Sequence, residues 1–197
     1  MFECRHAPYV VEEALARELE AHYSEPHRAY HNLTHIAELL RWFDAVADDI
    51  GWRDPRSIYD AILFHDVIYD PLSKHGSNEA RSAELATQHG ASTYTRDVIL
   101  LTARHGSVTR DEVDADAALF LDSDTAILGA RPDVFDAYDA AIAVEYKHVP
   151  ADAFRAGRRS FLANMRERPR IFLTDYFHDR LDATARANLA RAVARLS

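Results

Sequence analysis

The sequence predicts an all-α fold, and three observations support this prediction. Apolar residues recur at helical spacings of three and four along most of the chain, and strand-like alternation never persists beyond a few positions. Capping residues precede several of these stretches, and glycines follow them. The 197 residues contain no Gly, Ser or Pro-rich linker, so we expect a single compact helical domain over residues 1–197, resembling a helical bundle.

Five helices are predicted in the first half of the chain. The first opens near Pro8, because proline suits the first helical position, and a loop over residues 24–32 follows it. The second covers 34–49 and places Ile36, Leu40 and Phe43 on its apolar side. A cap at Asp54 and a proline after it start the third. The last three helices of this half are predicted over 55–69, 77–90 and 95–105.

Four helices are predicted in the second half. Apolar residues over 119–128 mark the sixth helix, and Gly129 stops it. The last three are expected over 132–149, 151–168 and 182–196, where the helical spacing of apolar residues resumes.

Composition limits the kind of protein this can be. The formal net charge of −9 argues against general nucleic-acid binding, which relies on clustered cations. Cys4 is the single cysteine, so neither an intrachain disulfide nor a zinc-thiolate cluster can form. The sequence has neither a signal-peptide pattern nor a run of about 18 apolar residues, so we expect a cytoplasmic protein that does not enter a membrane. Homo-oligomerisation is left open.

Four polar residues interrupt apolar helical stripes, namely His35, His65, Asp66 and Asp124. An isolated carboxylate in a protein core would cost more free energy than the whole domain's net stability. Two such acids together with two imidazoles are most simply explained by a bound cation. Imidazole and carboxylate ligands without thiolate suit a divalent ion, and Mn, Co, Ni, Fe, Zn and Mg remain open.

The last position of this set has two candidates, Asp122 and Asp124. Asp124 has large apolar residues three and four positions away on both sides, whereas Asp122 has mostly small ones. We therefore favour Asp124, with Asp122 as the alternative.

The chain resembles the HD-domain superfamily of metal-dependent phosphohydrolases. The signature of that superfamily is a His, a His-Asp pair on a later helix and a final Asp, matched here by His35, His65-Asp66 and Asp124. Further segments look like a branch known mostly as predicted phosphohydrolases. They are residues 26–35, 64–71, 78–79, 122–124 and 146–150.

The resemblance implies that the four residues hold a metal ion and that the chain hydrolyses a phosphate ester of a nucleotide or another small phosphorylated metabolite. Asp66, Asp70 and Glu79 are the expected catalytic acids. Guanosine-alarmone hydrolases of the superfamily carry a Glu where this chain has Tyr69, which argues against that substrate.

Substrate-binding candidates come from several parts of the chain. His31 and His27 could face the pocket or could hydrogen-bond the loop, and His105 lies on an apolar stripe and could serve a second ion or the substrate. Lys147 and Arg158 could reach a phosphate, although a solvated helix face also explains the arginines of 155–166. Two other functions remain as alternatives, a di-iron HD-fold oxygenase and a metal- or nucleotide-binding regulatory module without turnover.

Overall fold

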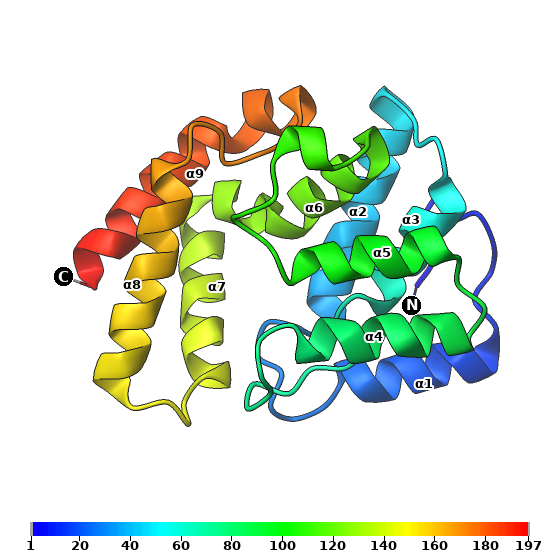
Figure 1. The fold of residues 1–197 in the computed structure, drawn as a ribbon, viewed down its shortest axis with the longest axis horizontal. Helices are drawn as coiled ribbons and strands as arrows, with labels where there is room; N and C mark the ends of the chain where they lie inside the picture. The colour runs from blue at the N-terminus through cyan, green and yellow to red at the C-terminus, as the bar shows by residue number, and fades with distance from the viewer. Residues whose placement is uncertain (1, 197) are drawn as a thin grey trace. The chain divides into compact units, whose positions relative to one another are not determined.

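The computed structural model describes residues 2–196, and this part of the chain is helical (Figure 1). It contains nine α-helices and two short 3₁₀ helices, and residues 2–196 include no strand, so the all-α prediction is confirmed. Within the same residues, no helix combines the length and the apolar character that crossing a membrane requires. The chain divides into two compact units, Met1–His105 and Gly106–Ser197. That these units make up one domain stays a prediction.

The first unit is built around one short, deeply buried helix, α3. The helices of this unit are α1 (Glu13–Tyr23), α2 (Leu33–Asp49), α3 (Pro55–Phe64), α4 (Ser77–Gln88) and α5 (Thr93–Thr102). Every residue of α3 from Ser57 onward is buried, and α2, α4 and α5 all pack against it. Ile58, Ile62 and Leu63 are fully buried in this core. A helix enclosed on all sides accounts for its near-continuous apolar sequence.

The second unit packs its helices around α9. It contains α6 (Ala115–Thr125), α7 (Pro132–Glu145), α8 (Ala151–Glu167) and α9 (Asp175–Arg195), with 3₁₀ helices η1 (Arg110–Glu112) and η2 (Ala126–Gly129). Helix α9 contacts α8, α6 and η2. At Gly129 a Cβ atom would lie 2.6 Å from the Cβ of Leu181, so the glycine permits the close approach of η2 and α9.

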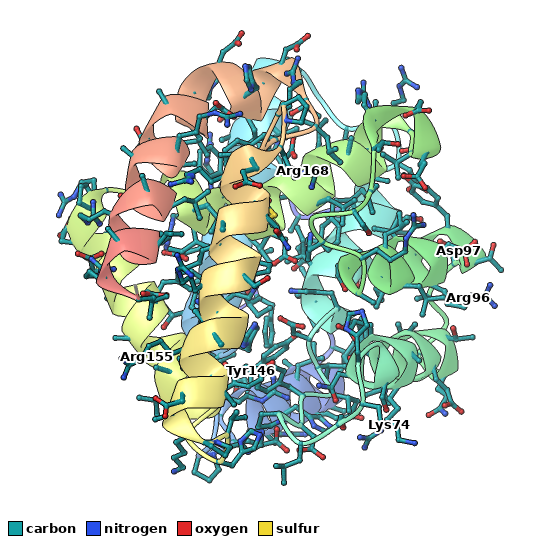
Figure 2. All side chains as sticks on the ribbon, turned by 60° about the vertical axis from the view of Figure 1, so that its left-hand side comes forward. Lys74, Arg96, Asp97, Tyr146, Arg155 and Arg168 are labelled. Carbon is teal, nitrogen blue, oxygen red and sulfur yellow. The ribbon has the colours of Figure 1, made fainter. Side chains whose placement is uncertain are left out.

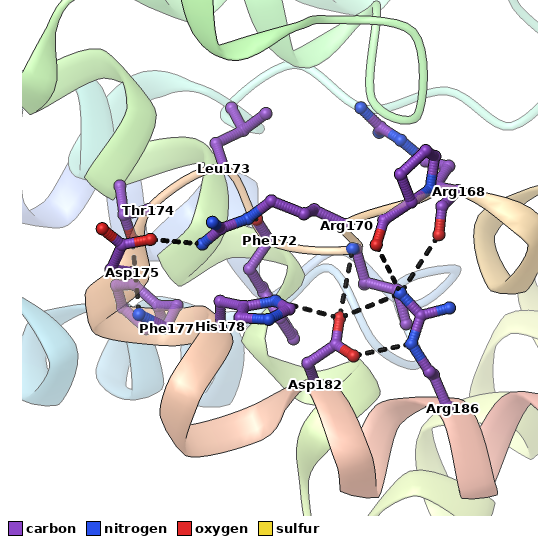
Figure 3. Close-up of polar contacts among 12 residues, drawn as sticks. Arg168, Arg170, Phe172, Leu173, Thr174, Asp175, Phe177, His178, Asp182 and Arg186 are labelled. Carbon is purple, nitrogen blue, oxygen red and sulfur yellow. Dashed lines mark hydrogen bonds and ion pairs between the residues drawn. The ribbon is translucent and has the colours of Figure 1, made fainter.

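The connection from α8 to α9 is fixed by buried and charged groups (Figure 3). The Arg186 guanidinium donates to the carbonyls of Arg166, Arg168 and Pro169 and pairs with Asp182. The Arg166 carbonyl lies in the last turn of α8, where carbonyls have no partner within the helix, and those of Arg168 and Pro169 belong to the segment that follows.

Three predicted helix boundaries lie at least five residues from those of the structure, and α7 ends at Glu145 rather than near Val149. Helix α1 begins at Glu13 rather than near Pro8. The segment before it is not helical, and the Tyr9 hydroxyl in this segment donates a hydrogen bond to Asp60 of α3. Helix α9 begins seven residues before the predicted Asp182, because the Thr174 side chain accepts from the Phe177 N–H and caps the helix there. Helix α3 ends at Phe64, five residues before the predicted end.

The early end of α3 has a physical cause. Beyond Phe64 the carbonyls of Asp66 and Val67 accept hydrogen bonds from the Arg28 guanidinium. The Asp70 N–H, which would continue the helix to Asp66, donates to Asn78 instead, and the residue four after Val67 is Pro71, which has no N–H to donate. Asp70 precedes Pro71, and the residue before a proline disfavours helical backbone. His65 and Asp66 therefore lie in a turn at the end of α3 rather than within a longer helix.

Candidate metal centre

Three of the four predicted ligands meet in the first unit. His35 is in the first turn of α2, and His65 and Asp66 follow the last residue of α3. The two Nε2 atoms of His35 and His65 are 3.2 Å apart. Asp66 Oδ2 lies 3.1 Å from Nε2 of His65 and 3.8 Å from Nε2 of His35. One potential ligand atom from each residue thus converges on a common point.

The spacing of these atoms fits a transition-metal or zinc ion. Ligand atoms that bind one ion at about 2.1 Å lie about 3.0 Å apart at octahedral angles and about 3.4 Å apart at tetrahedral angles. Two of the three distances fall in this range, and the third is slightly longer. Two imidazoles and one carboxylate are also a ligand set that divalent metals commonly use. The residues present therefore fit a metal ion, without selecting one metal.

A backbone carbonyl sets the orientation of His65. Its Nδ1 is 3.1 Å from the carbonyl oxygen of Ile62, one turn earlier in α3. A carbonyl only accepts hydrogen bonds, so Nδ1 must carry the proton. In the neutral ring the lone pair is then on Nε2, the atom that faces His35 and Asp66. This is the arrangement that metal-binding histidines use.

The site is buried on its histidine side and more open on its carboxylate side. His35 and His65 are 3% and 1% exposed, whereas 17% of the Asp66 side chain is exposed. Burial of the imidazoles keeps water from competing for their nitrogen atoms. Of the three residues, Asp66 is the one that solvent reaches most.

Aromatic rings surround the histidines of this group. The ring of Tyr30 lies 4.9 Å from that of His35, and His31 stacks on Tyr69 at 4.4 Å between ring centroids. The ring centroids of His31 and His35 are 6.1 Å apart, so His31 lies near the group, and its contact with a substrate stays a prediction. His27 Nε2 instead lies 2.8 Å from the Tyr69 carbonyl oxygen. This contact agrees with the alternative that His27 hydrogen-bonds a loop rather than facing the pocket.

Of the two predicted acids beyond Asp66, Asp70 makes structural contacts. Oδ1 of Asp70 accepts from the Leu72 N–H, and the Asp70 backbone exchanges two hydrogen bonds with the Asn78 side chain. Glu79 lies in the first turn of α4. Their catalytic roles stay predictions.

Asp122 and Asp124 are in the second unit, on α6. Asp122 is 2% exposed, and its two carboxylate oxygens accept from the N–H groups of Leu173 and Thr174 and from the Thr174 hydroxyl. Burial raises the pKa of Asp122 to about 6, and these hydrogen bonds oppose the shift. Asp122 therefore serves to hold the segment before α9, and the role of Asp124 as the fourth ligand stays a prediction.

The remaining substrate-binding candidates differ in their surroundings. His105 follows the end of α5, and Lys147 is exposed in the turn between α7 and α8. Arg158 pairs with Asp139 at 2.9 Å and lies 5.0 Å over the Tyr138 ring, so it links α8 to α7. Arg155 is exposed and points away from α8 (Figure 2), in agreement with the solvated-face interpretation.

One residue of this region has no role in the sequence analysis. Arg28, within the segment 26–35, has a side chain with 0% exposure and donates to the carbonyl of Asp66. Three of its four hydrogen bonds go to backbone carbonyls, which every residue carries and which no sequence pattern singles out. The presence of Arg28 in the family-like segment was the one signal that could have identified it.

Comparison with known proteins does not assign the chain to a family. No family model matches the chain, and neither a curated protein nor a solved structure shows significant similarity to it. Function is therefore inferred from the chemistry of His35, His65 and Asp66.

Proposed function

We propose that this protein is a metal-dependent hydrolase that cleaves a phosphate ester in a nucleotide or another small phosphorylated metabolite. One observation carries the proposal, the convergence of two imidazole nitrogens and a carboxylate oxygen at 3.1 to 3.8 Å. The order of these residues in the chain, and their resemblance to the HD superfamily, support phosphoester hydrolysis among the reactions that such a site could perform.

The three residues would hold the ion through Nε2 of His35, Nε2 of His65 and Oδ2 of Asp66. A bound divalent ion supplies a water of lowered pKa and polarises a phosphoryl oxygen. In the neutral ring, the hydrogen bond to the Ile62 carbonyl favours the tautomer of His65 whose lone pair is on Nε2, and both imidazoles are buried away from bulk water. Three protein ligands leave positions open for water and substrate.

Asp124 is the proposed fourth ligand, as the sequence predicts. The contacts of Asp122 support this choice, because both of its carboxylate oxygens already accept hydrogen bonds within the second unit. We expect Asp124→Asn to weaken metal binding.

An iron-dependent oxygenase is the second candidate, because two histidines and one carboxylate also form the ligand set of non-haem iron enzymes. The di-iron form of this alternative requires a second ion and hence further ligands. A regulatory module that binds metal or nucleotide without turnover is the third candidate.

The deciding experiment measures phosphate release from a panel of nucleotides and phosphomonoesters with Mn, Co, Ni, Fe, Zn or Mg added. We expect turnover by the wild type and its loss in His65→Ala and Asp66→Ala. Asp97→Asn, on the exposed face of α5 (Figure 2), is the matched control and should retain full activity.

Other outcomes identify the alternatives. The absence of turnover at full metal occupancy would contradict the proposal. Iron-dependent oxygen consumption would indicate the oxygenase, and two irons per chain would identify its di-iron form. Calorimetric nucleotide binding without product would indicate the regulatory module.

A further inference from the structure

Arg28 is a buried cation that belongs to the loop between α1 and α2. Its side chain has 0% exposure, and the residue as a whole is 6% exposed. An arginine is almost never fully buried without partners, because removing the guanidinium from water is costly. The contacts of Arg28 therefore show which segments its buried guanidinium holds together.

The guanidinium makes four hydrogen bonds, three of them to backbone carbonyls. Nη1 donates to the carbonyls of His31 at 3.0 Å and Asp66 at 2.7 Å, and Nη2 donates to that of Val67 at 2.8 Å. Nε donates to Oε2 of Glu25 at 2.9 Å. A planar fork with fixed donor directions can bind several carbonyls at once.

These carbonyls belong to the two segments that carry the candidate ligands. Asp66 and Val67 lie in the turn after α3, and Asp66 is itself one of the three residues of the site. His31 is four residues before His35, immediately before Asn32, which caps α2. One guanidinium thus joins the backbone that presents Asp66 to the backbone that leads to His35.

Two tyrosines fix the plane of the guanidinium. Its central carbon lies 5.2 Å from the ring centroid of Tyr23 and 5.4 Å from that of Tyr69. The Tyr23 hydroxyl also donates to the Leu63 carbonyl at 3.0 Å, in the last turn of α3. The end of α3 is therefore held both by Arg28 and by one of the rings that contact Arg28.

We propose that Arg28 is a positioning residue of the metal centre, which sets the distance between Asp66 and the two histidines through the backbone of the turn after α3. This inference rests on the proposed metal-binding function. Arg28 touches no ligand atom of the site and acts through the carbonyls of Asp66, Val67 and His31. A lysine would keep the charge but could not reproduce the fork.

The experiment measures the affinity of the full-length chain for Mn²⁺ by calorimetry and the stability of the metal-free chain by urea unfolding. We expect Arg28→Lys to weaken Mn²⁺ binding about tenfold, since residues that orient metal ligands typically contribute 10- to 100-fold. Arg186→Lys is the matched control, because Arg186 forms a similar fork over the carbonyls of Arg166, Arg168 and Pro169 in the second unit. The control should lose stability but keep its Mn²⁺ affinity within about twofold.

The outcomes separate positioning from stability. Arg28→Lys with unchanged Mn²⁺ affinity, or Arg186→Lys with an equal loss of affinity, would overturn the proposal. If Arg28→Lys does not fold, Glu25→Gln decides, because it keeps the side-chain shape and removes the charge that holds Nε. Weaker Mn²⁺ binding in Glu25→Gln supports the proposal, and unchanged binding overturns it.

The same measurements distinguish this inference from the proposed function. A wild type that binds Mn²⁺ but releases no phosphate from any ester would contradict the hydrolase and leave the role of Arg28 intact if Arg28→Lys binds Mn²⁺ more weakly. A wild type that binds no Mn²⁺ would overturn both.

Discussion

At the scale of single residues, the site depends on where protons and lone pairs lie. The Ile62 carbonyl fixes the proton of His65 on Nδ1, so Nε2 is directed toward His35 and Asp66 as a lone pair. Asp66 is the acidic member of the trio and the one with the most exposure. In the proposed metal centre Asp66 would therefore supply the negative charge that offsets a divalent ion.

We predict that Asp66→Asn abolishes metal-dependent stabilisation. A ligand that binds only the folded state adds about 2.7 kcal/mol at a concentration 100-fold above its Kd. The wild type should gain about that much on addition of Mn²⁺, whereas Asp66→Asn should gain less than about 1 kcal/mol, since the neutral amide is a poorer ligand. Urea unfolding with and without Mn²⁺ measures both gains. Equal gains in the two proteins would exclude Asp66 from the site.

The residues of the site differ in how far the sequence could predict them. His35, His65 and Asp66 each place a polar group on an apolar stripe, and the structure brings these three together. Arg28 interrupts no helical stripe and contacts carbonyls, which every residue has. Its role can therefore be recognised only once the path of the backbone is known, and the sequence pattern does not give that path.

At the scale of helices, the caps determine where the ligand-bearing segments begin. Asn32 caps α2, with Oδ1 accepting from the Thr34 N–H at 2.8 Å while Nδ2 donates to the Ala29 carbonyl at 3.0 Å. The predicted helix over 34–49 starts one residue after α2 and ends at the same residue, Asp49. The prediction succeeded because the capping residue and the spacing of apolar residues indicate the same helix. Helices α3 and α9 departed from prediction where a tertiary contact or an unrecognised cap decided the boundary.

We predict that Asn32→Ala destabilises the protein by about 1 kcal/mol through loss of the cap of α2. Asn32→Ser keeps an oxygen that can accept the Thr34 N–H, so it should lose less than half of that amount. Urea unfolding of the metal-free proteins gives both values. Equal losses for Ala and Ser would show that the Asn32 cap contributes little.

Helix α3 also contains an acid whose charge state should make stability depend on pH. Asp60 is 7% exposed, and burial raises its pKa, while the hydrogen bond from Tyr9 and the charge of Arg56 oppose the rise. A carboxyl with a raised pKa in the folded state stabilises the fold fully below its unfolded pKa of 3.8, and this stabilisation is lost as the pH rises through the folded pKa.

We predict that Tyr9→Phe extends this loss to higher pH, because the charged form of Asp60 loses its hydrogen-bond donor. The variant should be destabilised by about 1.5 to 3 kcal/mol at pH 7, where the bond is to a charged group, and by less near pH 4. Urea unfolding across this pH range tests the expectation. In an Asp60→Asn background the effect of Tyr9→Phe should be independent of pH, and a persistent pH dependence there would assign the titration to another group.

At the scale of the whole molecule, the chain consists of two helical units, and the candidate site places three ligands in the first. The sequence could predict the helical class and nine helices because periodicity is a local signal. It could not identify the division near His105, because Gly106 there is one glycine among several that follow helices. The predicted fourth ligand, Asp124, belongs to the second unit.

Metal removal should therefore have effects that can be mapped along the chain. Hydrogen exchange measured with Mn²⁺ and after chelation should show faster exchange without metal in α2 and in the turn after α3, because metal binding opposes local opening of the segments that supply ligands. If Asp124 is the fourth ligand, as the sequence predicts, α6 should respond as well. In Asp124→Asn the response of α6 should disappear while that of α2 remains. A response restricted to the first unit in the wild type would assign the ion to His35, His65 and Asp66 alone, and exchange that is unchanged by verified metal removal would contradict the metal centre.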